Sequence, residues 1–189
     1  MTTENRAKIL QAAFNVLSRH GYENASIKDI AEEANVAQGL VHYYFKSKQQ
    51  LVLAVLAVAC EKMELGEIQG EAGALAAFDT LKKMLVEARE THALYLQLIA
   101  VGLHDKEVGH GILDFLRADR ENIEAIARQV LAEREADPRP ARAIASVVEA
   151  AVLGIMIQSL VDPDFNADEA VDALAAMSLS AIYPPPQGA

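Results

Sequence analysis

Two short helical segments separated by about two residues restrict the fold of this chain more than any other feature. Over residues 27–34 the apolar side chains recur at i, i+3, i+4 and i+7, which predicts an amphipathic helix. A second helix is expected over 37–45, which leaves only Asn35 and Val36 for the turn. With a preceding helix over 4–20, these segments have the plan of a helix-turn-helix, whose second helix enters the major groove of DNA.

Capping residues mark the ends of these helices. Gly21 follows the first helix as a C-terminal stop, and Ser26 with Asp29 three positions on predicts an N-cap close to a capping box. Ser47, with a glutamine three positions on, opens a long fourth helix over 48–65. The first fifty residues are therefore expected to form a three-helix head.

The rest of the chain also predicts helices. No stretch has the alternating β-branched pattern of a strand. Glycines at 66, 70 and 73 are expected to mark a loop at the domain boundary, and the polar stretch 104–111 a second break. Further helices are expected over 74–90, 92–103, 112–135, 141–161 and 167–183. The fold class is therefore all-α, with about nine helices.

Residues 26–51, SIKDIAEEANVAQGLVHYYFKSKQQL, resemble the signature of TetR-family transcriptional regulators. The family pattern is roughly Thr-x-x-x-Ile-Ala, a small-residue turn, Gly-x-Leu-Tyr-x-His-Phe, then a basic residue and Lys-x-x-Leu. The matching positions are Ile30, Ala31, Val36, Gly39, Phe45, Lys48 and Leu51. Ala37, Leu40 and His42 depart from the pattern, and Ala37 deprives the third helix of a side-chain cap worth about 1 kcal/mol. The resemblance covers about residues 5–65.

The resemblance implies a division of labour along the chain. Residues 1–50 would form the helix-turn-helix DNA-binding domain, helix four at 48–65 would link the domains, and 51–189 would form a helical domain for ligand binding and dimerisation. The protein would then be a ligand-responsive, sequence-specific regulator, a repressor released from its operator by a small-molecule inducer of unknown identity. The alternative is a helical small-molecule-binding or interaction protein of the same fold without operator-specific DNA binding.

The DNA contacts are expected from the third helix and its flanks. Gln38 can pair with adenine and Leu40 can meet a thymine methyl group, with His42 as a third base reader; ordinary solvent exposure is the alternative. A dimer would read an inverted repeat in double-stranded DNA whose half-sites lie about 34–36 Å apart. The expected set, with tyrosines and Lys48 on phosphates, is Ser26, Lys28, Gln38, Gly39, Leu40, His42, Tyr43, Tyr44, Lys46 and Lys48.

Methionines in the second domain favour a cavity for an apolar ligand, because the methionine side chain adapts to varied shapes. An ordinary helical core explains each residue equally well. The acidic balance and the scarcity of aromatic residues favour a small, largely apolar inducer, either neutral or cationic. The expected lining residues are Met63, Met84, Tyr95, Leu98, Phe115, Met156 and Gln158.

The last two expected helices predict a homodimer. Residues 141–161 and 167–183 carry more apolar surface than one monomeric core needs, and small alanines allow helix pairs to approach closely in a two-fold, four-helix interface. The expected interface residues are Ala145, Val148, Ala151, Val152, Ile155, Leu160, Val171, Leu174 and Ala175.

Charge and cysteine content limit the partners and the cellular location. The net charge is -10, yet residues 1–50 carry six basic and five acidic side chains, so the excess of acid lies in the remainder. Such a chain suits a protein that contacts phosphates with its head alone. The single Cys60 excludes an intramolecular disulfide, and the apolar run 51–60 is half a membrane span. A cytoplasmic protein without membrane contact is expected.

Neither a metal site nor an enzyme is expected. His92, His104 and His110 lack the spacing of a tight ligand pair on one helix. No nucleophile with a matching base stands out, which disfavours a helical enzyme as a further alternative. The sequence therefore predicts no cofactor, no metal and no catalytic residues.

Overall fold

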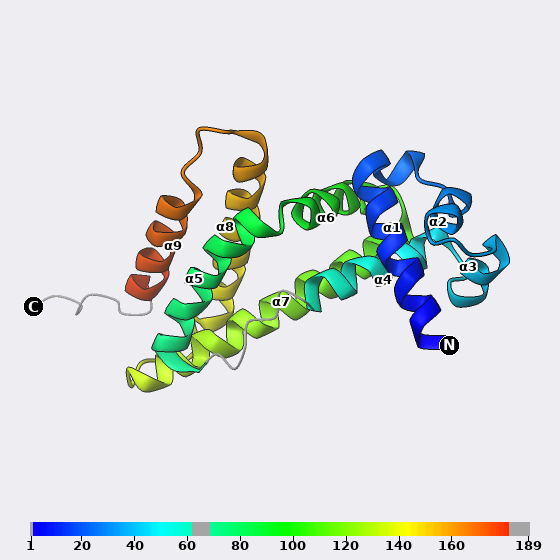
Figure 1. Ribbon diagram of the computed structural model, residues 1–189. Helices are drawn as coiled ribbons and strands as arrows, with labels where there is room; N and C mark the ends of the chain where they lie inside the picture. Colours follow the sequence, from blue (N-terminus) through cyan, green and yellow to red (C-terminus); the bar gives the residue numbers. More distant parts are fainter. Residues whose placement is uncertain (1, 62–68, 182–189) are drawn as a thin grey trace, which may run out of the picture. The chain divides into compact units, whose positions relative to one another are not determined.

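The computed structural model describes residues 2–61 and 69–181, and all regular structure within these ranges is helical (Figure 1). The predicted all-α class is confirmed. The helices are α1 (Thr2–Asn24), α2 (Ile27–Glu33), α3 (Gln38–Tyr44), α4 (Lys48–Glu61), α5 (Gly70–Glu87), α6 (Arg89–Gly102), α7 (Lys106–Glu133), α8 (Ala141–Val161) and α9 (Ala167–Ala181).

The helices group into two compact units. The first comprises residues 1–64 and 90–114, and the second comprises 65–89 and 115–189. A boundary at residue 50 therefore falls inside the first unit. The reason is packing: α1 contacts α2 and α4, and the buried α4 side chains, Leu51, Val52, Val55 and Leu56, extend the core of the head. The division into 1–50 and 51–189 remains a prediction about function.

Local signals in the head produce the expected caps. Gly21 has φ +73°, a value that favours glycine, and it interrupts the regular helix of α1. The Asp29 amide donates to Ser26 Oγ at 3.1 Å and the Ser26 amide donates to Asp29 Oδ2 at 3.0 Å, so the capping box of α2 is complete. The Ser47 hydroxyl accepts the amide of Gln50 at 3.0 Å, which opens α4.

The expected break at 104–111 is wrong over most of its length, because α7 begins at Lys106. Asp105 caps this start by accepting the amides of Glu107 and Val108 at 2.9 and 3.1 Å. Two glycines inside the helix leave room for neighbouring helices that approach closely. A Cβ at Gly109 would lie 2.5 Å from the carbonyl oxygen of Gly102 in α6, and one at Gly111 would overlap Leu53 of α4.

The start of α5 is fixed by the end of α7 within the second unit, so α5 begins at Gly70, earlier than predicted. Gly70 has φ +63°, and its amide donates to Gln129 Oε1 at 3.1 Å. The next residue accepts from Arg134, whose Nε lies 2.8 Å from Glu71 Oε2. Polar contacts with residues some sixty positions away therefore place this helix.

α8 has apolar residues on two faces. One face packs against α9, which also packs against α5. The other face is exposed, and it includes Val147 at 67% and Val161 at 77% exposure. By length and composition alone α8 could also cross a membrane.

His92 of α6 gives a testable pH dependence. Its side chain is buried at 6% exposure, and burial lowers its pKa from the ordinary value near 6.5. The unfolded chain therefore binds a proton below that pH while the folded chain does not. The free energy of unfolding should fall as pH drops through 6.5 toward the lower folded pKa, by at most about 1.4 kcal/mol per pH unit.

Urea unfolding at pH 7.0 and 5.5 checks this expectation. His92→Gln should lose less stability between the two pH values than the wild type. The matched variant His104→Gln, at an exposed position, should keep the wild-type dependence. Equal losses in His92→Gln and the wild type would contradict the assignment.

Candidate nucleic-acid interface

The orientation of α3 follows from its buried residues. Val41 is fully buried, Phe45 at the C-cap is 4% exposed, and Ile30 of α2 is fully buried, so these side chains hold α3 against the head. The opposite side exposes Gln38, Gly39, His42 and Tyr43, while Leu40 is half-buried. The structure thus presents to solvent most of the residues that the sequence assigns to base contacts.

Gly39 is exposed on α3. A Cβ at this position would lie within 4 Å of no described residue. Glycine inside a helix costs about 0.5–1 kcal/mol relative to alanine. The N-cap of the same helix, Ala37, makes no side-chain cap, as predicted. A helix weakened at two positions and open at Gly39 suits a close approach by a partner outside the chain.

The two tyrosines at the end of α3 have different environments. Tyr43 is 69% exposed, whereas Tyr44 is half-buried. Their rings meet edge to face with centroids 5.3 Å apart. Of the pair, Tyr43 has the phenol that a phosphate can reach without any rearrangement.

The sequence predicts a phosphate contact for Lys48, yet the ammonium group of this residue is engaged within the head. Its ammonium donates to the backbone carbonyl of Tyr22 and lies 4.2 Å from the centroid of the Tyr22 ring. Burial lowers the pKa of Lys48. The side chain therefore joins the end of α1 to the start of α4, and its main contribution is to the folded head.

The remaining basic residues are divided between internal pairs and free charges. Lys28 lies 3.7 Å from Glu32, in an exposed pair of little strength. Lys46 is exposed and makes no ion pair with any residue that the structure describes. Arg6 of α1 stacks over the Phe45 ring with a centroid distance of 5.5 Å. Sequence reasoning missed Arg6, since it lies more than thirty positions before the end of α3.

The sequence pattern described as "Bacterial regulatory proteins, tetR family" matches residues 9–55, which include the whole helix-turn-helix. The chain belongs to the TetR family. This family consists of regulators without enzymatic activity.

Relatives of this TetR-family chain agree on the head and on the fold. The regulator YvdT of Bacillus subtilis is 46% identical over 54 residues, which cover 29% of this chain and 28% of YvdT, so the match concerns the head. A transcriptional regulator of Pseudomonas aeruginosa PAO1 has a TM-score of 0.82 at 22% identity, over 97% and 93% of the chains. A regulator of Saccharomonospora viridis, solved in complex with choline, has a TM-score of 0.72 at 22% identity, over 93% and 95%.

The predicted ligand residues fall in both compact units. Half-buried Tyr95 and buried Leu98 belong to α6 in the first unit. In the second unit Met156 is buried, Met84 and Phe115 are half-buried, and Gln158 is exposed; Met63 lies outside the described residues. A shared pocket for this set stays a prediction.

The predicted dimer residues lie mainly in the core of the second unit. Ala145, Val148, Ile155, Val171, Leu174 and Ala175 are all buried, and α8 packs on α9 within the chain. Ala151, Val152 and Leu160 are half-buried. The sequence predicts contact with a second copy for these residues, because periodicity does not distinguish a helix face that meets α9 from one that meets another copy. The exposed face of α8 is the better candidate.

Proposed function

We propose that this TetR-family protein is a ligand-responsive repressor that binds an inverted-repeat operator as a homodimer until an inducer releases it. The observation that carries the proposal is the exposed face of α3, with Gln38, Gly39, His42 and Tyr43 turned away from the head core. Gln38 and His42 would read base edges, and Tyr43, Lys46 and the additional Arg6 would hold phosphates.

A regular seam on α8 supports the homodimer. The seam consists of residues spaced alternately four and three apart, the repeat of helices that pack side by side: Ala143, Val147, Ala150, Gly154, Ile157 and Val161. Five of them, two alanines, two valines and one isoleucine, are exposed, and a Cβ at Gly154 would lie within 4 Å of no described residue. Met177 on α9, at 69% exposure, adds a further unburied apolar side chain. Two-fold pairing of these faces would bury them.

A buried carboxylate supports a neutral or cationic inducer over an anionic one. Glu149 of α8 is 7% exposed; its Oε2 accepts from Arg120 Nε at 2.7 Å, and Oε1 has no hydrogen-bond partner among the described residues. The regulator of Saccharomonospora viridis with the related fold binds choline, a quaternary ammonium compound. The inducer would occupy the body and favour the conformation that does not bind DNA.

Two hydrogen bonds would carry the signal into the head. Gln49, in the first turn of α4, donates to Asp105 Oδ2 at 2.9 Å, and Ser47 donates to Glu107 at 3.3 Å. Asp105 also caps α7, so a shift of that helix start is transmitted directly to the start of α4. Since α4 follows α3 after three residues, a shift of α4 would also move α3. The spacing of the two recognition helices in the dimer would then change.

Salt-titrated operator binding tests the proposal. The wild-type affinity for an operator selected from random DNA should fall steeply with salt, since bound phosphates release counterions. Gly39→Ala should weaken binding at least about tenfold, because a methyl group fills space that the DNA approaches, while stabilising the head by up to about 1 kcal/mol. Ala7→Gly, at an exposed position of α1, is the control for the effect of head stability on operator binding. A flat salt dependence, or an unchanged affinity in Gly39→Ala, would favour the alternative without operator binding.

A further inference from the structure

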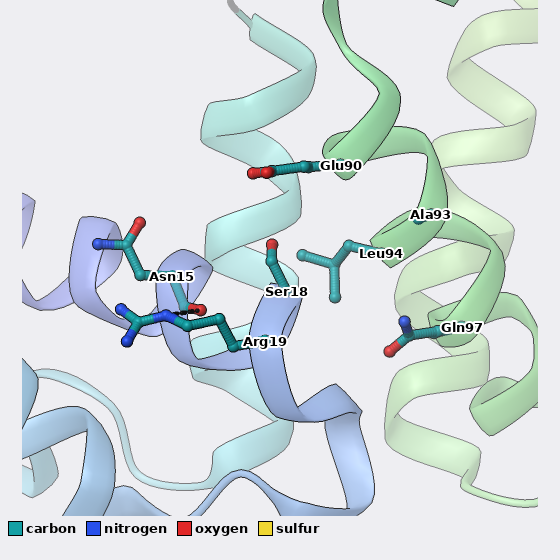
Figure 2. A pocket seen from close by; sticks show the side chains of 7 residues that line it. All are labelled: Asn15, Ser18, Arg19, Glu90, Ala93, Leu94 and Gln97. Atoms are coloured by element: carbon teal, nitrogen blue, oxygen red, sulfur yellow. Dashed lines mark hydrogen bonds between the residues drawn. The ribbon is translucent and has the colours of Figure 1, made fainter. Parts of the chain in front are cut away.

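A polar groove lies between α1 and α6, within the first unit (Figure 2). Its volume is about 460 Å³, which falls in the range of small-molecule sites. α1 contributes Asn15, Ser18 and Arg19, and α6 contributes Glu90, Ala93, Leu94 and Gln97. Spacings of three and four residues place each set on one face of its helix. Buried Leu94 supplies an apolar wall between the polar side chains.

The positive charge of this groove is already neutralised. The Arg19 guanidinium pairs with Glu33 of α2, and Asn15 Nδ2 donates to the same carboxylate oxygen at 3.3 Å. These hydrogen bonds hold the pKa of Glu33 below its ordinary value, so the pair stays ionised at neutral pH. An anion entering the groove would have to compete with Glu33 for Arg19.

Three other polar groups in the groove lack partners among the described residues. Ser18 Oγ is buried without a hydrogen bond. The carboxylate of Glu90 and the amide of Gln97 make no hydrogen bond or ion pair with any described residue. The Gln97 oxygen faces α1, where a Cβ at Gly21 would lie 3.4 Å from it. Of the three groups only Ser18 Oγ is buried, so a ligand that gives it a hydrogen bond offsets the cost of its burial, whereas Glu90 and Gln97 are exposed.

We propose that this groove binds a short aliphatic compound with a primary ammonium group at one end and a second hydrogen-bonding group at the other. The ammonium donates to Glu90, the lining charge that no described residue neutralises. The second end bonds Ser18 Oγ and Gln97 Oε1, and the chain between lies along Leu94. Glu90 and Gln97 are about 10 Å apart along the axis of α6, since each residue rises 1.5 Å. A five-carbon diamine is a suitable probe of this span.

None of the residues that line the groove belongs to the proposed DNA-contact or inducer sets. The same α1 residues that line the groove hold Glu33 of α2. A bound diamine therefore links α6 to the helix that precedes the recognition helix. Binding should be felt at α2 as well as at the groove.

Three probes of equal chain length test the site on the full protein without DNA. 1,5-Diaminopentane should bind in calorimetric titration, whereas 1,5-pentanediol and glutarate should bind at least about tenfold more weakly. In nuclear magnetic resonance spectra the diamine should shift the Gln97 side-chain amide and the Gly21 backbone amide. Equal binding of the diol, or tighter binding of glutarate, would overturn the proposal.

Matched variants separate the site from general attraction to an acidic protein. Glu90→Gln should weaken the diamine about tenfold, and Ser18→Ala should weaken it by a smaller factor. Glu121→Gln removes an exposed carboxylate of α7 in the second unit and should leave binding unchanged. Circular dichroism should show all three variants folded, because Glu90 and Glu121 are exposed and Ser18 Oγ makes no hydrogen bond with the described residues. Equal losses in Glu90→Gln and Glu121→Gln would show a nonspecific ionic effect and contradict the site.

Discussion

An Ala150→Arg variant should be monomeric at micromolar concentration and should bind the operator about 10²–10⁴-fold more weakly than the wild type. Ala150 is exposed and lies near the middle of the α8 seam. In a two-fold dimer each arginine would enter the other copy's apolar seam and face its symmetry mate, without a carboxylate to pair with. A monomer then binds one half-site at a time and loses the gain from linked heads.

Sedimentation and operator titration in parallel check this prediction. The matched control is Ala125→Arg, which places the same charge at an exposed alanine of α7. It should remain dimeric with nearly wild-type affinity. If Ala150→Arg stays dimeric and binds the operator normally, the seam is not the interface. If it becomes monomeric but keeps its affinity, the head binds DNA without the help of a second copy.

The sequence predicts the head well because its signals are local. The capping box at Ser26, the N-cap at Ser47, the stop at Gly21 and the buried stripe through Ile30 each involve residues within four positions of one another. All of these expectations agree with the structure. The fold class follows for the same reason, since helical periodicity is itself a local property.

Errors arose where a distant residue decides the local structure. Gly109 and Gly111 have the composition of a loop, yet they lie in α7 because Gly102 and Leu53 approach them closely. Lys48 has the position of a phosphate contact, yet it folds back onto Tyr22. Neither approach is visible in a sequence window, because each depends on helices brought together by tertiary packing.

The same limit affects the sites of the body. Apolar residues on α8 recur on two faces, and periodicity alone does not show which face α9 covers. The groove between α1 and α6 joins Ser18 to Glu90 and Gln97, more than seventy positions away, so no motif spacing could indicate it. The groove was therefore outside the reach of sequence reasoning, whereas the exposed face of α3 was not.

Arg120→Met should destabilise the second unit by about 2–4 kcal/mol. Glu149 has a side-chain exposure of 8% and takes its ion pair from Arg120 alone among the described residues. Removal of the guanidinium leaves a buried carboxylate without a counterion. The partial exposure of Arg120, 37%, places the expected loss below that of a fully buried pair. Urea unfolding measures the change, and Arg117→Met, at an exposed arginine of the same helix, is the control.

The double variant Arg120→Met/Glu149→Leu distinguishes a charge effect from lost packing. Without the carboxylate, no buried charge remains, and most of the stability should return. The double variant should also bind organic cations less well than the wild type if Glu149 contributes to the inducer site, with the fold intact. A double variant no more stable than Arg120→Met would mean that the unpaired carboxylate of Glu149 is not the cause of the lost stability. In that case Glu149 would lose its role as the buried charge that selects the ligand.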